Sequence, residues 1–113
     1  MWLLAGDTRV EGVRPAIEDP RAAVMISAVS VWESAIKSAL GKLRVPDDLP
    51  ERLDGFAFER LAITDVHAWA VRALPPVHSD PFDRLLAAQA LCERATIVSA
   101  DAIFDRYGVT RVW

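Results

Sequence analysis

The chain has 113 residues, a length typical of a single domain, and a formal net charge of −3 at pH 7. Hydrophobic residues make up 52% and charged residues 26%, a balance that excludes an intrinsically disordered chain and a membrane-spanning one. The acidic charge argues against a protein that binds nucleic acid by basic charge alone. It does not exclude a substrate bridged by metal ions, because bound cations reverse the local sign of an acidic site. We expect one soluble domain over residues 1–113.

The sequence gives no sign of export. Residues 1–5 have no basic leader and no apolar run of the length that a signal peptide needs, which favours a cytoplasmic protein. Cys92 is the single cysteine, so an intrachain disulfide and a thiolate zinc site are excluded. We expect Cys92 to be a small buried hydrophobic residue.

Helical and strand patterns alternate along nearly the whole chain. In chain order, the predicted elements are a buried strand at 22–27, a helix at 30–42, a short helix at 48–52, a strand at 58–63, a helix at 65–74, a buried helix at 81–94, a strand at 96–99, a short helix at 101–107 and a closing strand at 109–113. The alternation predicts an α/β fold in which helices pack on parallel strands, and right-handed crossovers then make the sheet doubly wound.

The beginning of the chain departs from this alternation. Residues 1–6 (MWLLAG) have the pattern of an apolar helix tail closed by Gly6, with neither a cap nor a strand before it. The pattern therefore predicts that the first strand of the sheet is missing.

Carboxylates follow the predicted strands. In open parallel sheets ligands bind beyond the carboxyl ends of the strands, where Glu33, Asp80, Asp83 and Asp101 are expected. Each acid also has a structural explanation: Glu33 would complete a capping box with Ser30, Asp80 and Asp101 fit helix caps, and Asp83 complements a helix dipole. Carboxylates that converge repel one another, and a divalent cation with oxygen ligands is the common remedy.

The acids therefore favour a Mg²⁺ site, with Mn²⁺ as the alternative ion. Such a site serves phosphodiester hydrolysis, in which metal ions activate water and neutralise charge on the phosphate. His67 and His78 are expected to be packed, surface or loop histidines rather than ligands. Two roles stay open for three basic residues, contacts to RNA phosphates or solvated positions on helix faces: Lys37, Lys42 and Arg84.

Three segments together resemble the PIN-domain toxins of VapBC toxin–antitoxin modules in order and spacing. They are SAVSVWE at 27–33 with Lys37 and GKL at 41–43, DPFDRLLAAQA at 80–90, and TIVSAD at 96–101. The resemblance extends over residues 2–113 and implies a PIN-like parallel sheet flanked by helices in three layers. It also implies a Mg²⁺-dependent endoribonuclease toxin, a VapB-like antitoxin that covers the acidic pocket, and a homodimer.

By motif, the resemblance assigns Glu33, Asp83 and Asp101 to the second, third and fourth acids of the family. Ser99 takes the small hydroxyl position, and Asp80 is the less certain acid of its pair. The family opens with an apolar strand that ends in an aspartate, for which this sequence has no counterpart. Asp7 follows the predicted helix tail, and we expect it to lie far from the metal.

The departure leaves three hypotheses open. The first is an RNA-cleaving toxin whose start site was assigned too late or whose gene has decayed. The second is a catalytically inactive, truncated PIN remnant that only binds an antitoxin or dimerises. The third is a metal-dependent receiver-like or phosphatase domain that turns over small phosphates without cleaving RNA.

Overall fold

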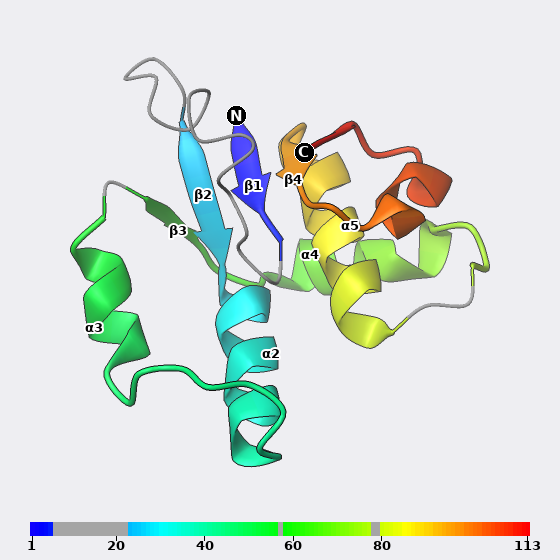
Figure 1. The fold of residues 1–113 in the computed structure, drawn as a ribbon. Coiled ribbons are helices and arrows are strands. Elements are labelled where there is room, and N and C mark those ends of the chain that lie inside the picture. Colours follow the sequence, from blue (N-terminus) through cyan, green and yellow to red (C-terminus); the bar gives the residue numbers. More distant parts are fainter. Residues whose placement is uncertain (6–22, 57, 78–79) are drawn as a thin grey trace.

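The structure is a computed structural model that describes residues 1–5, 23–56, 58–77 and 80–113. These residues form a five-stranded parallel sheet with helices beside it (Figure 1). The strands are β1 (Trp2–Leu4), β2 (Val24–Ser27), β3 (Glu59–Leu61), β4 (Thr96–Val98) and β5 (Arg111–Val112). The helical elements are α2 (Ala28–Ala39), α3 (Leu49–Asp54), α4 (Asp65–Ala70), η2 (Val71–Ala73), α5 (Pro81–Glu93) and η3 (Ala102–Tyr107).

The strand order is β3-β2-β1-β4-β5, and every pair of neighbouring strands is parallel. Parallel neighbours require crossover connections, which α2 with α3, α4 with α5, and η3 supply between the described strands. The predicted α/β class and the parallel sheet flanked by helices are confirmed. All carboxyl ends of the strands meet at one edge of the sheet, which is where a doubly wound fold places its ligands.

The prediction that the first strand is missing is wrong. Trp2–Leu4 forms β1 at the centre of the sheet, hydrogen-bonded in register to Val24–Ile26 on one side and Thr96–Val98 on the other. A short apolar run followed by glycine fits the end of a helix and the end of a strand equally well, so periodicity cannot separate them. Pairing with two buried neighbouring strands satisfies the backbone polar groups of residues 2–4, and this favours a strand over a helix.

A correction also applies to the start of α2. The helix begins at Ala28, and its N-cap is Ser27, whose hydroxyl accepts a hydrogen bond from the Val29 N–H at 3.0 Å. Ser30 therefore lies inside the helix and does not form the expected capping box with Glu33. The predicted end is confirmed, since Gly41 takes a left-handed conformation (φ +72°) just after Leu40, where a side chain would be strained.

The caps that the sequence predicts at Asp80 and Asp101 are confirmed. Thr64 and His67 form a reciprocal capping box at the start of α4, Asp80 caps α5 with Pro81 in the first turn, and Asp101 caps η3. Two of these caps, Asp80 and Asp101, are acids at the carboxyl edge of the sheet. Helix capping therefore fixes the backbone positions of these two residues at the edge of the sheet.

Apolar side chains pack on both faces of the sheet. The larger cluster joins Leu3, Met25 and Ile97 of the strands to α5 and η3, with Leu86 and Phe104 among its fully buried members. The smaller cluster lies on the opposite face and contains Leu4, Val24 and Val98. Cys92, expected to be buried, is exposed on α5. Among the described residues no helix is long and apolar enough to span a membrane.

A buried polar network connects the helices behind the sheet edge. The Gln89 amide on α5 accepts from the Ser27 hydroxyl and donates to the Ala62 carbonyl and to Nδ1 of His67 at 3.3 Å. Nδ1 of His67 also accepts from the Thr64 N–H at 3.2 Å, so the ring hydrogen sits on Nε2, which donates to Glu93 at 2.8 Å. We call this set the Gln89 network: Ser27, Ala62, Thr64, His67, Gln89 and Glu93.

Candidate functional site

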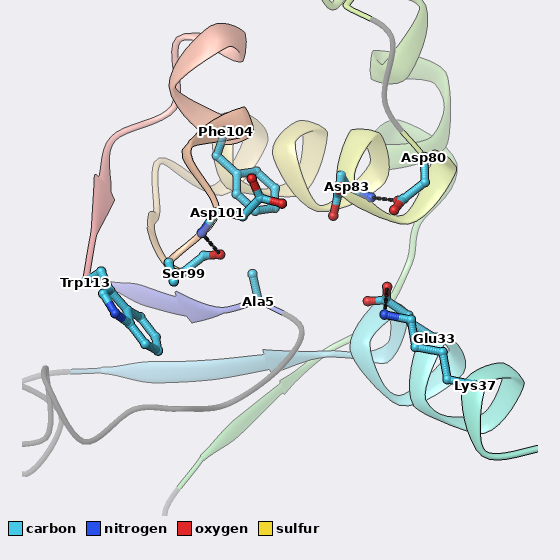
Figure 2. Close-up of a pocket in the computed structure, with 10 residues that line it drawn as sticks. Ala5, Glu33, Lys37, Asp80, Asp83, Ser99, Asp101, Phe104 and Trp113 are labelled. Carbon is cyan, nitrogen blue, oxygen red and sulfur yellow. Dashed lines mark hydrogen bonds and ion pairs between the residues drawn. The ribbon is translucent and has the colours of Figure 1, made fainter. Parts of the chain in front are cut away.

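A cavity of about 350 Å³ opens at the carboxyl edge of the sheet. It receives side chains from β1, α2, α5 and the β4–η3 connection, and it brings together every acid that the sequence singled out as a metal ligand (Figure 2). We call it the acid pocket, and its lining residues are Ala5, Glu33, Lys37, Asp80, Asp83, Ser99, Ala100, Asp101, Phe104 and Trp113.

Glu33 forms one wall of the acid pocket from the second turn of α2. It is only 7% exposed, and its carboxylate makes an ion pair with Nζ of Lys37, one turn further along the helix, at 3.0 Å. The hydrogen bond that Lys37 donates to Glu33 raises the pKa of Lys37, and the charges of Glu33, Asp80 and Asp83 act in the same direction. Lys37 therefore stays protonated and offsets part of the negative charge in the pocket.

Asp80 and Asp83 line the pocket from the first turn of α5. The Asp80 carboxylate accepts a hydrogen bond from the Asp83 N–H at 2.8 Å, which orients both residues. Pro81 starts the helix between them and has a φ suited to that position. Both carboxylates lie at the positive end of the helix dipole, which lowers the cost of placing two acids this close together.

Ser99 and Asp101 form the third wall, just after β4. Ser99 is nearly buried and its hydroxyl accepts from the Asp101 N–H at 3.0 Å, while the Asp101 carboxylate accepts from the Ile103 N–H at 3.0 Å. Figure 2 shows the Asp101 and Glu33 carboxylates directed toward the space beside Asp83. Three separate segments therefore present carboxylates to one cavity.

Besides Ala100, which lies between Ser99 and Asp101, the lining includes three residues that the sequence reasoning missed: Ala5, Phe104 and Trp113. Ala5 follows β1 directly, so the position next to the end of this central strand holds no carboxylate. The prediction that Asp7 lies far from the metal depended on a helix at residues 1–6 and loses that support; Asp7 itself lies outside the described residues. The signal that could have indicated these three residues was their position in the chain. Ala5 and Trp113 come directly after strands, at the carboxyl edge of the sheet, and Phe104 lies in η3.

Among the other candidates that the structure describes, none of His67, Arg84 and Lys42 lines the acid pocket. His67 is a core residue of the Gln89 network, and His78 lies outside the described residues. Arg84 donates hydrogen bonds to the carbonyls of Val71, Pro75 and Val77, so its guanidinium supports the turn before α5. Lys42 is exposed beyond the end of α2.

The donor chemistry of the acid pocket fits a hard divalent cation, which prefers carboxylate and other oxygen ligands. The side chains are, however, farther apart than the ligands of one metal ion: within the described ranges, no three His, Cys, Asp or Glu side chains are close enough to hold one ion together. Glu33 is paired with Lys37, and Ala5 offers no donor. The pocket therefore has suitable donors, and holding an ion with three of them requires their side chains to move inward.

The fold and the pocket define an α/β domain with an acidic site at the carboxyl edge of its sheet. The model of the PIN domain family matches residues 1–109, and the chain belongs to this family. A search of curated proteins finds no match in sequence.

Solved structures share the fold at low sequence identity. The chain is similar to VapBC2 from Rickettsia felis bound to promoter DNA (17% identity, TM-score 0.74, covering 100% of this chain and 99% of that chain). It is also similar to FitAcB from Neisseria gonorrhoeae (22%, 0.69, covering 100% and 97%) and to FitAB bound to the IR36 DNA fragment (22%, 0.70, covering 99% and 94%). At these identities the likeness establishes the fold alone.

Proposed function

We propose that the protein is a metal-dependent endoribonuclease of the VapC type, the toxic member of a toxin–antitoxin pair. The observation that carries this proposal is the convergence of Glu33, Asp80, Asp83 and Asp101 on one cavity of a PIN domain. Four carboxylates from three segments cost stability through mutual repulsion, and among the described lining residues Lys37 is the one cation. Such an arrangement is understandable when a divalent cation completes it.

In this proposal Asp83 and Asp101 hold a Mg²⁺ ion, with Glu33 and Asp80 as further oxygen donors and Mn²⁺ as an alternative ion. The bound ion would supply activation of water and neutralisation of charge on the phosphodiester. Ser99 positions Asp101 through the 3.0 Å hydrogen bond from the Asp101 N–H. Lys37 holds Glu33 in place and adds one positive charge where an RNA phosphate would approach.

The proposed partners follow from the same class. Two of the similar structures, VapBC2 and FitAB, are bound to DNA fragments. We infer for this chain a VapB-like antitoxin that covers the acid pocket, an RNA substrate and a homodimer. A cytoplasmic location agrees with an RNA target, and it remains a prediction.

The test is cleavage of structured RNA by the purified chain, freed of any antitoxin, with Mg²⁺ present. Asp83→Asn keeps the size of the side chain and removes its charge, so we expect the cleavage rate to fall by at least about 100-fold. Glu51→Gln is the matched control, because this first-turn acid belongs to α3 and does not line the acid pocket. Its activity should equal that of the unchanged protein.

One observation favours a second function, a catalytically inactive module that only binds an antitoxin or a second copy. Ala5 stands at the end of the central strand and contributes no ligand, and within the described residues no group of three acids is close enough for an ion. Under this alternative the unchanged protein cleaves no RNA with either Mg²⁺ or Mn²⁺. It would still bind the antitoxin, and Asp83→Asn would change nothing.

A further inference from the structure

The acid pocket has an aromatic side chain on its rim. Trp113 lines the cavity while its side chain remains 43% exposed, on the side of Ser99 and away from Glu33 (Figure 2). An indole ring is apolar on its face and offers a flat surface on which another planar group can stack. The pocket therefore has acids on one side and a flat apolar surface on the other.

Trp113 follows directly after a well-anchored strand. The Val112 carbonyl accepts from the Ser99 N–H at 3.0 Å, and the Arg111 side chain donates to the Ser99 carbonyl at 3.1 Å. The Arg111 guanidinium also makes a two-pronged ion pair with Asp105, with both N···O distances at 2.9 Å. These contacts connect the backbone before Trp113 to Ser99, the residue that positions Asp101.

The other exposed tryptophans of the described residues have different surroundings. Trp32 packs edge-on against Phe82 with ring centroids 4.6 Å apart, and Trp69 stacks with the guanidinium of Arg72 at 4.5 Å. Neither ring lines the acid pocket. Trp113 therefore combines an exposed aromatic surface with a position beside the acids.

We propose that Trp113 is a stacking platform for one nucleobase of the RNA substrate, next to the phosphate that lies at the acids. This inference rests on the proposed function and adds a binding requirement to it: the nucleotide beside the cleaved bond is unpaired. Every base offers a flat face to an aromatic ring, so the platform accepts all four bases and selects single-stranded regions. The acid pocket, at about 350 Å³, lies within the size range of small-ligand sites, which suits one nucleotide.

The test measures binding of short single-stranded RNAs in which one base at a time is replaced by an abasic sugar. Ca²⁺ replaces Mg²⁺ so that binding is measured without cleavage. For the unchanged protein we expect one abasic position to weaken binding by roughly 5- to 150-fold, the range for loss of one base–aromatic stack. Trp113→Ala should weaken binding of intact RNA by a similar factor and should no longer respond to that abasic position, because the interaction is already lost.

Two variants serve as controls. Trp113→Phe keeps an aromatic surface and should retain most of the affinity and the response to the abasic position. Trp69→Ala removes an exposed tryptophan outside the acid pocket and should bind as the unchanged protein does. The circular dichroism spectrum and thermal midpoint of Trp113→Ala show whether the fold is retained.

The outcomes separate this inference from the proposed function. Base-dependent binding without cleavage in Mg²⁺ would overturn the proposed function and leave the platform in place. Cleavage with no abasic effect, or an equal effect in Trp113→Ala, would overturn the platform alone. A Trp113→Ala protein that binds purified antitoxin more weakly but RNA unchanged would also overturn it, by assigning this ring to a protein partner. Absence of RNA binding would overturn both.

Discussion

The acid pocket and the Gln89 network are two polar clusters that share α5 and meet at α2, which carries Glu33 of the pocket and is capped by Ser27 of the network. Their polar groups are satisfied in opposite ways. In the Gln89 network every side-chain donor meets an acceptor: Gln89 is fully buried, His67 is 2% exposed, and the one carboxylate, Glu93, lies at the outer end. In the acid pocket four carboxylates share one cavity with Lys37. The first arrangement stabilises the fold, whereas the second makes sense through what it binds.

The two clusters are connected through the helices that carry them. Ser27 caps α2, which presents Glu33, and Gln89 lies two turns along α5 from Asp83. The hydrogen bond between Ser27 and Gln89 fixes the two helices relative to each other. A satisfied buried network thus positions like-charged groups that would otherwise move apart.

Gln89→Leu should cause the largest loss of stability. The substitution removes the amide partner of the buried Ser27 hydroxyl, of the part-buried Ala62 carbonyl and of Nδ1 of His67, which keeps only its hydrogen bond from the Thr64 N–H. We expect the free energy of unfolding to fall by about 3 kcal/mol, because buried polar groups are left unsatisfied. Urea unfolding followed by circular dichroism measures it. Glu93→Gln, at the outer end of the network, should cost much less, and equal losses would contradict the account.

Ala5→Asp should make the acid pocket more dependent on metal. The new carboxylate would stand at the end of β1, in a position 5% exposed and beside the other acids. Without divalent ions we expect a loss of about 2 kcal/mol from burial and repulsion, and Mg²⁺ should restore part of it by binding the folded state. Thermal unfolding with and without Mg²⁺ measures both effects.

Ala5→Asn is the matched control for that variant, since it has nearly the same size and no charge. It should lose less stability and should show no added response to Mg²⁺. If the two variants behave alike, Ala5 does not face the acids, and the position of β1 beside the pocket is wrong.

Thr64→Ala should have a moderate effect at the edge of the Gln89 network. The Thr64 hydroxyl accepts from the His67 N–H at 3.2 Å and caps α4. Loss of the cap should reduce the free energy of unfolding by about 1 kcal/mol. Thr64→Ser keeps the hydroxyl and should restore the stability, measured by urea unfolding. A Thr64→Ser protein as unstable as Thr64→Ala would mean that the cap contributes nothing.

The smallest expected effect is on how stability depends on pH, through the ion pair that anchors β5. The Arg111 guanidinium lowers the pKa of Asp105 below its ordinary value of 3.8. A carboxyl with a lowered pKa contributes stability above that ordinary value and loses it as the pH falls through the pKa of the folded state. Asp105→Asn should therefore be slightly less stable than the unchanged protein at neutral pH, and the difference in thermal midpoint should vanish in strong acid. A difference independent of pH would contradict this origin.

Much of the fold could be predicted from the sequence because short-range signals agree with the tertiary structure. The runs at Val24–Ser27 and Thr96–Val98 are short, apolar and followed by helices, and Asp80 with Pro81 marks the start of α5. For residues 1–6 the sequence predicts a helix tail because the run is too short for its period to be seen. Trp2–Leu4 is identified as a strand by its place between β2 and β4 in the sheet.

The site was partly predictable for a similar reason. Acids that follow parallel strands must share an edge of the sheet, so the gathering of Glu33, Asp83 and Asp101 follows from topology. The Lys37 pair with Glu33 depends on side-chain conformation, and the place of Trp113 depends on the pairing of β5 with β4. Neither is a property of local sequence. The exposure of Cys92 also depends on which face of α5 packs inward.

The most direct test of the central claim is Mn²⁺ binding to the purified protein, followed by the electron paramagnetic resonance of the free ion. The account predicts one or more saturable sites whose affinity drops sharply in Asp83→Asn and in Asp101→Asn. Both changes preserve side-chain size, and Asn retains the capping ability of Asp101. Binding that is absent in the unchanged protein, or equal in all three proteins, would contradict the claim that the acid pocket is a divalent-metal site.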